Sequence, residues 1–409
     1  MRPKEALQLL QMRKPTLNRT ERALARCVTI EDLREVACRR WPRGVRGYVE
    51  GGADAEVSLS RNQAAFAAFD LIPRILEDVS AVDTSCDILG TKSAFPFGLG
   101  PTGYTRMMHT DGERAVARAA RAAGIPYSLS TMSTVRLEEL AETIGGNLWF
   151  QLYMWRDQGL VNDLIDRADA SGYRTLVITV DCVVTGQRVG DIHNGFTLPP
   201  RVTPSTVLDM ARHPAWCYSL MRGEVITFAN FAPAISRRSV GVMEFAARQF
   251  DASITWDNVR AIRDKWAGPL VIKGIVSPED ARRAKDVGAD AVVLSNHGGR
   301  QLDQARPPIE ALPEARAEVG EDFKIFVDSG VRRGTDLAIA LALGADACLV
   351  GRPYLYGLGA AGQAGVAASI RMLGDELRRA MQLLGVASVA QLRAEGASLV
   401  RRRLPALPR

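Results

Sequence analysis

The clearest pattern along the chain is an alternation between short, continuously apolar runs and Ala-rich stretches whose apolar residues recur every three or four positions. Runs of the first kind predict buried β-strands, and the second pattern predicts amphipathic helices. Buried strands that alternate with helices indicate a parallel sheet, because helices then cover its faces. The predicted strands lie within residues 97–103, 126–131, 148–154, 175–181, 270–274, 291–297, 324–330 and 348–352.

This succession of βα units predicts an α/β fold of the (β/α)8 TIM-barrel type. A doubly wound open sheet is the alternative, although no Gly-x-Gly-x-x-Gly sequence follows the first strand to indicate a dinucleotide site. Residues 1–84 precede the first strand and are expected to form a mainly helical extension. The barrel itself is then expected over residues 85–390, and a tail over residues 391–409.

The interval between the fourth and fifth predicted strands is longer than one connecting helix needs, and residues 195–250 form the excess. Long insertions in compact domains are usually lids, docking segments or disordered, and the aromatic content here argues against plain disorder. A surface excursion, an active-site cover and a membrane-docking patch all stay open. The residues that motivate membrane contact are Trp216, Tyr218, Phe228 and Phe231 with Arg212, Arg222, Arg237 and Arg238.

Composition narrows the class of protein. The net charge is +6, but the arginines are spread along the chain, which argues against nucleic-acid binding. The six cysteines form no Cys-x-x-Cys pair, which is typical of reduced thiols in the cytoplasm, and no metal site is expected. No apolar run approaches the length of a membrane span, and the N-terminus lacks a secretory apolar core. We therefore expect a cytoplasmic protein, with peripheral attachment at the inner face of the cell membrane as an open alternative.

Polar residues stand at the end of every predicted strand. In a TIM barrel the active site lies at the C-terminal ends of the strands, so these side chains are expected to converge. One polar strand end would be unremarkable in a soluble protein, but a complete set predicts a functional site. The set comprises Thr102, Ser130, Gln151, Tyr153, Thr179, Asp181, Lys273, Ser295, His297, Arg300, Asp328 and Arg352.

The last two predicted strands end in glycine-rich turns, at residues 328–334 and 351–353. Turns of this kind hold phosphate groups through backbone N–H groups and a helix N-terminus. Arg332 or Arg352 could add a charge-assisted contact. A ligand that carries phosphate is therefore expected, and glycine turns without a ligand are the alternative.

His297 is the best candidate for a general base, because an imidazole has an ordinary pKa near ~6.5 and the other histidines lie outside strand ends. Asp181 could orient it and support the imidazolium. Arg300 suits a carboxylate, and Arg188 is a second cation able to approach. Lys273 could form a Schiff base or place a positive charge beside a cofactor. The set predicts proton removal from a small carboxylic acid, coupled to a change that a cofactor accepts.

The stretches around these strand ends resemble the FMN-dependent L-2-hydroxy-acid oxidases and dehydrogenases over roughly residues 25–390. Within that family the chain is most similar to the flavin-dependent, quinone-linked L-lactate dehydrogenases of respiratory membranes. The family stretches are SNHGGRQLD, VDSGVRRGTD, ALALGADA, VIKG, WFQLYM and PTG, and the subgroup stretches are GGADAEVSL, GIPYSLST, HPAWCYSL and LYGLGAAGQAGV.

The resemblance implies a role for each candidate residue in the oxidation of a 2-hydroxy acid. His297 would take the substrate proton, from the α-carbon or from the hydroxyl, and Asp181 would support the imidazolium. The N-terminal extension would contribute to the active site through one tyrosine. The residues implied to bind the substrate carboxylate and hydroxyl are Tyr48, Tyr153, Arg188 and Arg300.

The same resemblance implies FMN as the cofactor, bound by the barrel. It reassigns Lys273 from a Schiff-base lysine to a cation near the flavin N1–C2 carbonyl. The other residues implied to contact FMN are Pro101, Thr102, Gly103, Ser130, Gln151, Thr179, Ser295, Asp328, Gly330, Arg332, Gly351 and Arg352.

Two positions bear on substrate and electron acceptor. Gly103 stands where oxidases of the family tend to have alanine, which favours a dehydrogenase that reacts slowly with oxygen. Without an added haem domain, a quinone or another external carrier is expected. Met132 stands where some relatives carry a bulky aromatic residue, so the side-chain pocket stays open between L-lactate, the first expectation, and mandelate or a longer acid oxidised with oxygen.

A non-redox, phosphate-binding barrel enzyme such as an aldolase or isomerase is the alternative from another class. A homotetramer or octamer is the expected assembly, because similar proteins are commonly four-fold tetramers or pairs of them.

Overall fold

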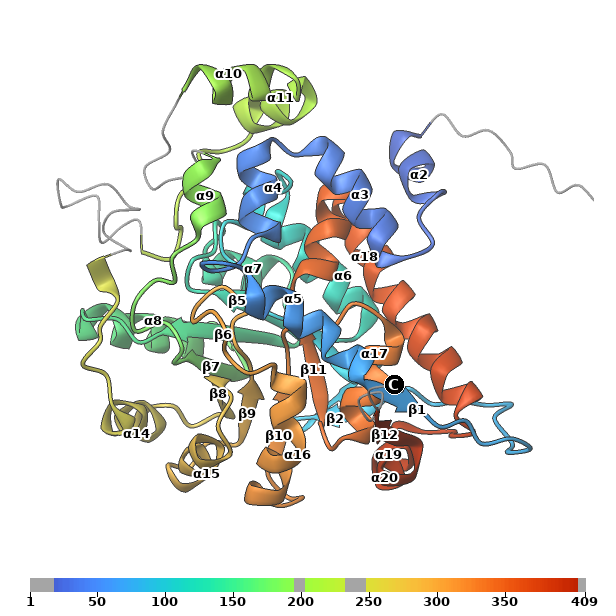
Figure 1. Ribbon diagram of the computed structural model, residues 1–409. Coiled ribbons are helices and arrows are strands. Elements are labelled where there is room, and N and C mark those ends of the chain that lie inside the picture. The colour runs from blue at the N-terminus through green and yellow to red at the C-terminus, as the bar shows by residue number, and fades with distance from the viewer. Residues whose placement is uncertain (1–17, 195–202, 232–247, 404–409) are drawn as a thin grey trace, which may run out of the picture.

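A computed structural model of the chain describes residues 18–194, 203–231 and 248–403, and its central strands close into a parallel barrel (Figure 1). Each strand pairs with the next in sequence, and β11 closes the barrel by pairing with β4. The TIM-barrel prediction is confirmed, and the open-sheet alternative is wrong. The strands are β4 (Phe97–Leu99), β5 (Tyr127–Ser130), β6 (Leu148–Tyr153), β7 (Thr175–Thr179), β8 (Leu270–Ile275), β9 (Ala291–Leu294), β10 (Lys324–Val327) and β11 (Ala347–Val350).

Helices follow the strands and cover the outside of the barrel (Figure 1), which explains why strands such as β7 are buried along their whole length. The first of them, α6, ends at Gly124, whose φ of +66° is the left-handed conformation that commonly terminates helices. The covering helices are α6 (Gly112–Ala123), α7 (Leu137–Thr143), α8 (Gln158–Ala170), α14 (Trp256–Lys265), α15 (Pro278–Asp286), α16 (Pro308–Val319), α17 (Gly334–Ala342) and α18 (Arg352–Leu383).

The two-residue periodicity of the strands divides the barrel interior into an apolar layer and a polar layer. The apolar layer is sealed near the start of the strands by Ile88, from the hairpin of β2 (Cys86–Ile88) and β3 (Thr91–Ser93). Its larger members along the barrel strands are Trp149, Val177, Val271, Val293, Phe326 and Leu349. Two positions further along five of the same strands come Gln151, Thr179, Lys273, Ser295 and Asp328. A closed core therefore lies below a polar opening.

The N-terminal segment places helices over this opening. Its helices are α2 (Arg19–Leu24), α3 (Ile30–Arg40), α4 (Arg43–Glu50) and α5 (Val57–Ala64). A capping box between Thr29 and Asp32 starts α3, which packs against α18. The indole of Trp41 follows α3 and donates to the Met108 carbonyl at 2.9 Å. This anchoring brings α4, and with it Tyr48, to the mouth of the barrel.

The last part of the N-terminal extension meets the C-terminal segment near the lower edge of the barrel (Figure 1). Strand β1 (Phe69–Leu71) pairs antiparallel with β12 (Val400–Arg402). The tail expected from residue 391 begins inside α19 (Val389–Ala394), which is followed by α20 (Gly396–Leu399). The C-terminal segment is thus paired with the N-terminal extension.

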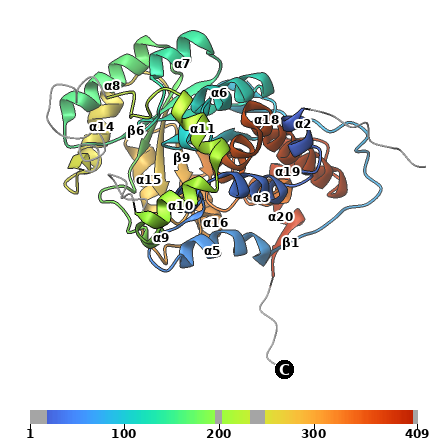
Figure 2. The same cartoon turned by 90° about the horizontal axis from the view of Figure 1, so that it is seen from above.

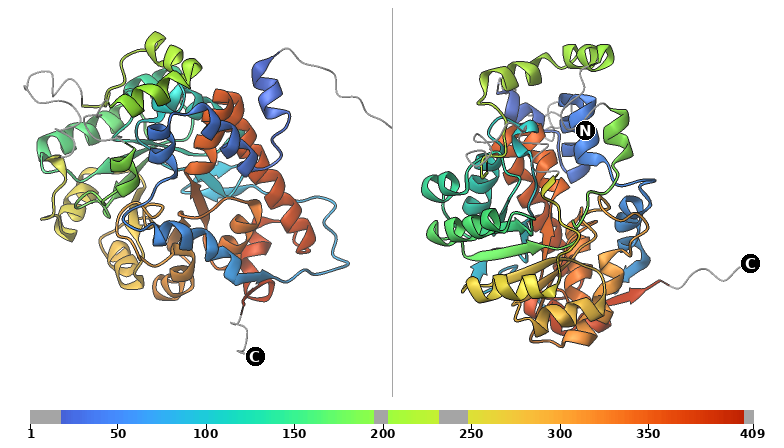
Figure 3. Two further views of the ribbon diagram at one scale, coloured as in Figure 1. Left: turned by 45° about the horizontal axis from the view of Figure 1, so that its top comes forward. Right: turned by 90° about the vertical axis from the view of Figure 1, so that its left-hand side faces the viewer.

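After β7 comes α9 (Val189–His193), and the long insertion that follows forms α10 (Pro204–Ala211) and α11 (Pro214–Arg222). Seen from above, α10 and α11 lie over the C-terminal end of the barrel, and in Figure 3 they are the green helices at the top of the right-hand view (Figure 2, Figure 3). Each begins with a proline at its first position, where the missing N–H is harmless. In the described ranges, no helix is long and apolar enough to cross a membrane.

The aromatic patch expected on this insertion needs a correction. Phe228 and Phe231 are buried, because Phe228 packs on Tyr104 and Phe231 packs on Trp155 with ring centroids 4.5 Å and 4.8 Å apart. Tyr218 is 53% exposed, while Arg237 and Arg238 lie outside the described residues. The apolar side chains that do face outwards are Val207, Leu208, Met210, Met221 and Val225.

At the opposite end of the barrel, the buried pair of Arg316 and Asp346 joins α16 to the start of β11. The guanidinium of Arg316 approaches the Asp346 carboxylate at 2.7 Å and also donates to the carbonyls of Gly320, Phe323 and Gly344. Both side chains are less than a tenth exposed, at 7% and 6%. The carboxylate also accepts from the backbone N–H of residue 325, at the start of β10.

Replacement of Asp346 by alanine leaves the Arg316 charge buried without its partner, so we expect the free energy of unfolding to fall by about 3–5 kcal/mol. Urea unfolding followed by circular dichroism measures this change. Asp257→Ala is the matched control, because its ion pair with Arg260 is exposed and should contribute less than about 1 kcal/mol. Equal losses in the two variants would contradict the assignment.

Candidate active site

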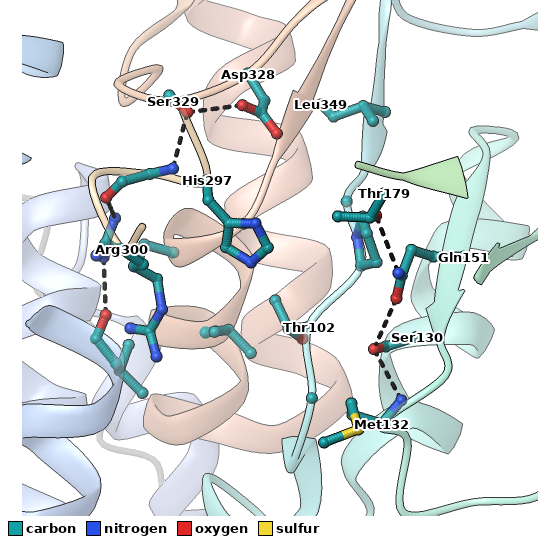
Figure 4. Close-up of a pocket in the computed structure, with 18 of the residues that line it drawn as sticks. Thr102, Ser130, Met132, Gln151, Thr179, His297, Arg300, Asp328, Ser329 and Leu349 are labelled. Atoms are coloured by element: carbon teal, nitrogen blue, oxygen red, sulfur yellow. Dashed lines mark hydrogen bonds between the residues drawn. The ribbon is translucent and has the colours of Figure 1, made fainter. Parts of the chain in front are cut away.

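A pocket opens at the C-terminal ends of the strands, and every barrel strand or the turn after it contributes to its lining. Figure 4 shows His297 and Arg300 on one side of this pocket, with Ser130, Gln151 and Thr179 across from them. The sequence-predicted residues that line it are Tyr48, Pro101, Thr102, Gly103, Ser130, Gln151, Tyr153, Thr179, Arg188, Lys273, His297, Arg300, Asp328, Gly330, Arg332, Gly351 and Arg352. The two others, Asp181 and Ser295, lie directly behind lining residues, against His297 and Lys273.

His297 and Asp181 form a close pair across β8. The Nδ1 atom of His297 lies 2.9 Å from Oδ1 of Asp181, whose side chain is 12% exposed. Burial alone would raise the pKa of Asp181, but the nearby His297 and Lys273 bring that pKa below its ordinary value. The carboxylate is therefore ionised at neutral pH and positioned to support an imidazolium.

The turn after His297 depends on its two glycines. Three consecutive residues have left-handed backbone, with φ of +57° at His297, +67° at Gly298 and +75° at Gly299. A Cβ on Gly299 would lie 2.6 Å from the backbone nitrogen of Leu59, and the Gly299 carbonyl accepts from Ala53 at 2.8 Å. Only glycine fits this approach of the N-terminal extension, and the turn directs the next residue, Arg300, back into the pocket.

Arg300 and Arg188 flank the ring of Tyr48, at 4.8 Å and 5.8 Å from the ring centroid. The Arg300 guanidinium donates to the backbone carbonyls of Tyr48 and Gly51. Burial, together with the neighbouring Arg188, lowers the pKa of Arg300 to about 10. Carbonyl dipoles compensate this partly buried cation only in part, so a carboxylate ligand would complete its surroundings.

Tyr153 extends from the end of β6 with its ring edge-to-face against Phe250, at 5.7 Å between centroids. Burial, with the nearby Cys182 and Asp181, raises the pKa of Tyr153 well above its ordinary value. Its hydroxyl therefore keeps its proton at neutral pH. Tyr153 is suited to donate a hydrogen bond to a ligand oxygen.

The far end of the pocket holds two further arginines. Arg352 donates to the carbonyls of Val49, Gly51 and Gly298 at 2.8–3.0 Å, and burial and the charge of Arg332 lower its pKa to about 9. Burial also lowers the pKa of Arg332. Arg352 begins α18, and Arg332 lies in the turn after β10. These two partly buried cations fit a phosphate group, which would supply the missing counter-charge.

The turn that carries Arg332 has no room for a larger residue. Gly330 has a φ of +114°, and a Cβ there would lie 2.2 Å from the carbonyl oxygen of Asn62. The same turn places Ser329 so that its hydroxyl accepts from the Gly298 N–H at 2.9 Å and donates to Asp328 at 2.7 Å. The turns after β9 and β10 are therefore fixed to one another.

Lys273 lies between the two ends of the pocket. Its ammonium pairs with Asp328 at 3.0 Å and donates to the Ser295 hydroxyl at 2.8 Å. Burial alone would lower the pKa of Lys273, but the carboxylates of Asp328 and Asp181 raise it overall. A lysine that stays charged does not supply the free amine of a Schiff base, so the aldolase-type role is disfavoured.

A row of hydrogen bonds crosses β5, β6 and β7 beside this lysine (Figure 4). Ser130 Oγ donates to Gln151 Oε1 at 3.1 Å, and Gln151 Nε2 donates to Thr179 Oγ1 at 2.9 Å. The row of polar side chains suits the edge of the flavin ring, and the Lys273 ammonium suits its N1–C2 region. The two arginines at the far end of the pocket suit the ribityl phosphate of FMN. The donor set therefore fits FMN, which Arg332 and Arg352 would hold at one end and Lys273 at the ring.

Some pocket residues were not predicted from the sequence. Phe250 comes from the long insertion and Asp191 from α9 just before it, and Asp191 lies 3.7 Å from Arg188. Tyr104, Ser329 and Leu349 line the pocket beside predicted neighbours, and the two-residue period of β11, which places Leu349 on the same face as Gly351, could have found Leu349. No sequence signal distinguishes Phe250 from other aromatic residues of the insertion.

Comparison with known proteins agrees with this geometry. The FMN-dependent dehydrogenase family matches the chain over residues 37–399. The chain is 44% identical to an L-lactate dehydrogenase of Caulobacter vibrioides, over 88% of this chain and 95% of the relative. It is 43% identical to a 4-hydroxymandelate oxidase of Amycolatopsis orientalis, over 90% of this chain and 97% of the relative.

A solved structure of similar fold is the monotopic membrane protein (S)-mandelate dehydrogenase, with a TM-score of 0.88 and 38% identity over 92% of this chain and 100% of that one. The family match spans the barrel, the helix that carries Tyr48 and both glycine-rich turns. The chain therefore belongs to the FMN-dependent dehydrogenase family, and FMN is its cofactor.

Proposed function

We propose that the protein oxidises L-lactate to pyruvate and passes the electrons to a quinone or another external carrier. One observation carries the proposal: the Asp181–His297 pair faces the same pocket as two arginines that lie beside Tyr48. Bound FMN supplies the acceptor for the two electrons that leave the substrate. FMN-dependent oxidation of a 2-hydroxy acid is what this family membership implies, and L-lactate is the proposed member of that class.

The protein's own side chains bind and deprotonate the substrate. Arg300 and Arg188 bind its carboxylate, and the neutral hydroxyl of Tyr153 donates to its hydroxyl oxygen. His297 takes the proton on the ring nitrogen that does not face Asp181, and the Asp181 carboxylate stabilises the resulting imidazolium. Removal of the α-proton and removal of the hydroxyl proton use the same base, so one arrangement serves either route.

Mandelate is the second candidate substrate, and the lining of the pocket favours it in one respect. Met132 and Phe250 present an apolar wall, and methionine adapts its shape to ligands of different size. A relative of this chain carries the name 4-hydroxymandelate oxidase, while another is named as an L-lactate dehydrogenase. L-lactate is proposed first because the subgroup resemblance favours it.

The external acceptor is proposed from Gly103. This residue lines the pocket, and a Cβ there would lie 3.0 Å from the Cβ of Met132, closer than ordinary packing. Oxidases of the family tend to have alanine at this position, and glycine avoids the close contact that an alanine Cβ would make with Met132. The proposal is therefore a dehydrogenase in function.

Peripheral membrane contact is proposed for the face formed by α10 and α11, where a lipid-soluble quinone would be met. Leu208 and Met221 are 56% and 77% exposed on these helices, and Arg222 lies over the Tyr218 ring at 4.7 Å. Exposed apolar residues beside cations are typical of helices that bind at a membrane surface. The similar (S)-mandelate dehydrogenase is itself described as a monotopic membrane protein, which supports the proposal.

Anaerobic L-lactate should bleach the flavin of the wild-type enzyme, and His297→Gln should slow this step about 10²–10⁴-fold because the base is lost. The absorbance spectrum of the purified variant should show that FMN stays bound. His193→Gln, an exposed histidine at the end of α9, is the control and should keep the wild-type rate. Bleaching of His297→Gln at the wild-type rate would refute the proposed base, and faster bleaching by (S)-mandelate than by L-lactate would reverse the substrate assignment.

The enzyme reduced by its substrate should react slowly with oxygen and rapidly with a soluble quinone. Stopped-flow absorbance, in which reduced protein is mixed with each acceptor in turn, gives the two rates. Reoxidation by oxygen at the rate seen with quinone would identify an oxidase and would contradict the role assigned to Gly103.

The double variant Leu208→Glu, Met221→Glu should bind anionic vesicles at least about 100-fold more weakly, because each buried apolar side chain contributes about 1.5–3 kcal/mol. Co-sedimentation with vesicles measures binding, and turnover with a soluble dye should stay unchanged. Leu76→Glu is the control, since Leu76 is 99% exposed but lies outside the insertion. Wild-type protein that stays in the supernatant would rule out this contact.

A further inference from the structure

One cysteine lies directly against the Asp181–His297 pair. Cys182 follows Asp181 in the chain, and its Sγ lies 3.3 Å from Asp181 Oδ1 and 3.5 Å from His297 Nδ1. The third distance, from His297 Nδ1 to Asp181 Oδ1, is 2.9 Å, so the three atoms form a triangle. Neither the pocket lining nor the proposed oxidation uses the thiol. Spacing in the sequence does not indicate the group, because Cys182 and His297 are 115 residues apart.

The triangle is close to the ligand geometry of zinc. Bond lengths of about 2.3 Å to sulfur and 2.0–2.2 Å to nitrogen and oxygen place the ligand atoms of a tetrahedral ion ~3.3–3.6 Å apart. The two distances that involve Sγ already fall in this range, and only Nδ1 and Oδ1 need to separate, by roughly 0.5 Å. A thiol, an imidazole and a carboxylate are also the ligand types that zinc prefers.

A second observation points independently to a ligand at this place. The other carboxylate oxygen of Asp181, Oδ2, is buried and has no hydrogen-bond partner within the described part of the chain. Buried carboxylate oxygens normally accept hydrogen bonds or bind a cation. Among the described residues, these three form the one group of histidine, cysteine and acidic side chains close enough to hold a metal ion.

We propose that Asp181, Cys182 and His297 bind a Zn²⁺ ion, with water at the fourth position, and that this ion inhibits the enzyme. Binding forms a bond from zinc to the Cys182 sulfur and releases the thiol proton to solvent. At His297 the ion takes the lone pair of Nδ1. The ring proton of the neutral imidazole then resides on Nε2.

This rearrangement removes the general base. With its proton on Nε2 and zinc on Nδ1, His297 has no lone pair left to accept the substrate proton. Asp181, bound to the same ion, no longer supports an imidazolium. The inhibition rests on the base assigned to His297 in the proposed function, whereas binding of the ion rests only on the three side chains.

Zinc titration of the FMN-loaded enzyme, in a buffer without phosphate or chelator, tests the inhibition. Loss of a residue that only supports a metal ligand typically costs 10–100-fold in affinity, so Cys182→Val should raise the half-inhibitory zinc concentration at least about tenfold. Cys182→Ser should also raise it and serves if the valine variant does not fold. Cys217→Val is the control, because this partly exposed thiol on α11 hydrogen-bonds only to a backbone carbonyl.

Cobalt(II) provides a readout that does not depend on turnover. The wild-type holoenzyme and Cys217→Val should show a thiolate-to-cobalt charge-transfer band that Cys182→Val lacks and that zinc abolishes. No band in the wild type, or equal zinc sensitivity of wild type and Cys182→Val, would overturn the proposed site. A cobalt band without zinc inhibition would overturn the inhibitory role, and His297→Gln bleaching tests the base separately.

Discussion

The pocket is organised around positive charge that the protein itself leaves largely uncompensated. Arg300, Arg332 and Arg352 are enclosed at the mouth of the barrel, where burial lowers the pKa of each below its ordinary value. The hydrogen bonds of Arg300 and Arg352 go to backbone carbonyls, whose dipoles offset only part of the desolvation cost. The phosphate of FMN at one end of the pocket and the carboxylate of a substrate at the other would match this distribution of charge.

The arginines can occupy these positions because the N-terminal extension is fixed against the glycine turns. The carbonyls that receive Arg300 and Arg352 belong to residues 48–51 of the extension and to Gly298. Glycine at position 299 allows Leu59 to approach, and glycine at position 330 allows Asn62 to approach. The extension is therefore part of the site and supplies both Tyr48 and the acceptors that hold two cations.

The barrel and the residues at its strand ends could be predicted with little more than periodicity. The run 175–181 is apolar where helices cover the strand and polar where the strand reaches the mouth of the barrel. Thr179 and Asp181 were therefore expected at the mouth, and both lie there. The insertion was harder to interpret, because aromatic content does not distinguish an anchor from an exposed patch. Phe228 and Phe231 are buried anchors, and the outward face carries aliphatic residues and methionines instead.

The sequence by itself determined the order of the strands, the alternation of apolar and polar layers inside them, and the residue types that reach the mouth of the barrel. These features depend on local periodicity and on the rule that parallel strands end at the same edge. Only the tertiary structure decided that Cys182 lies against His297, that Phe250 lines the pocket and that Lys273 stays charged beside Asp328. Each of these depends on distances and desolvation between segments far apart in the chain, which no local pattern records.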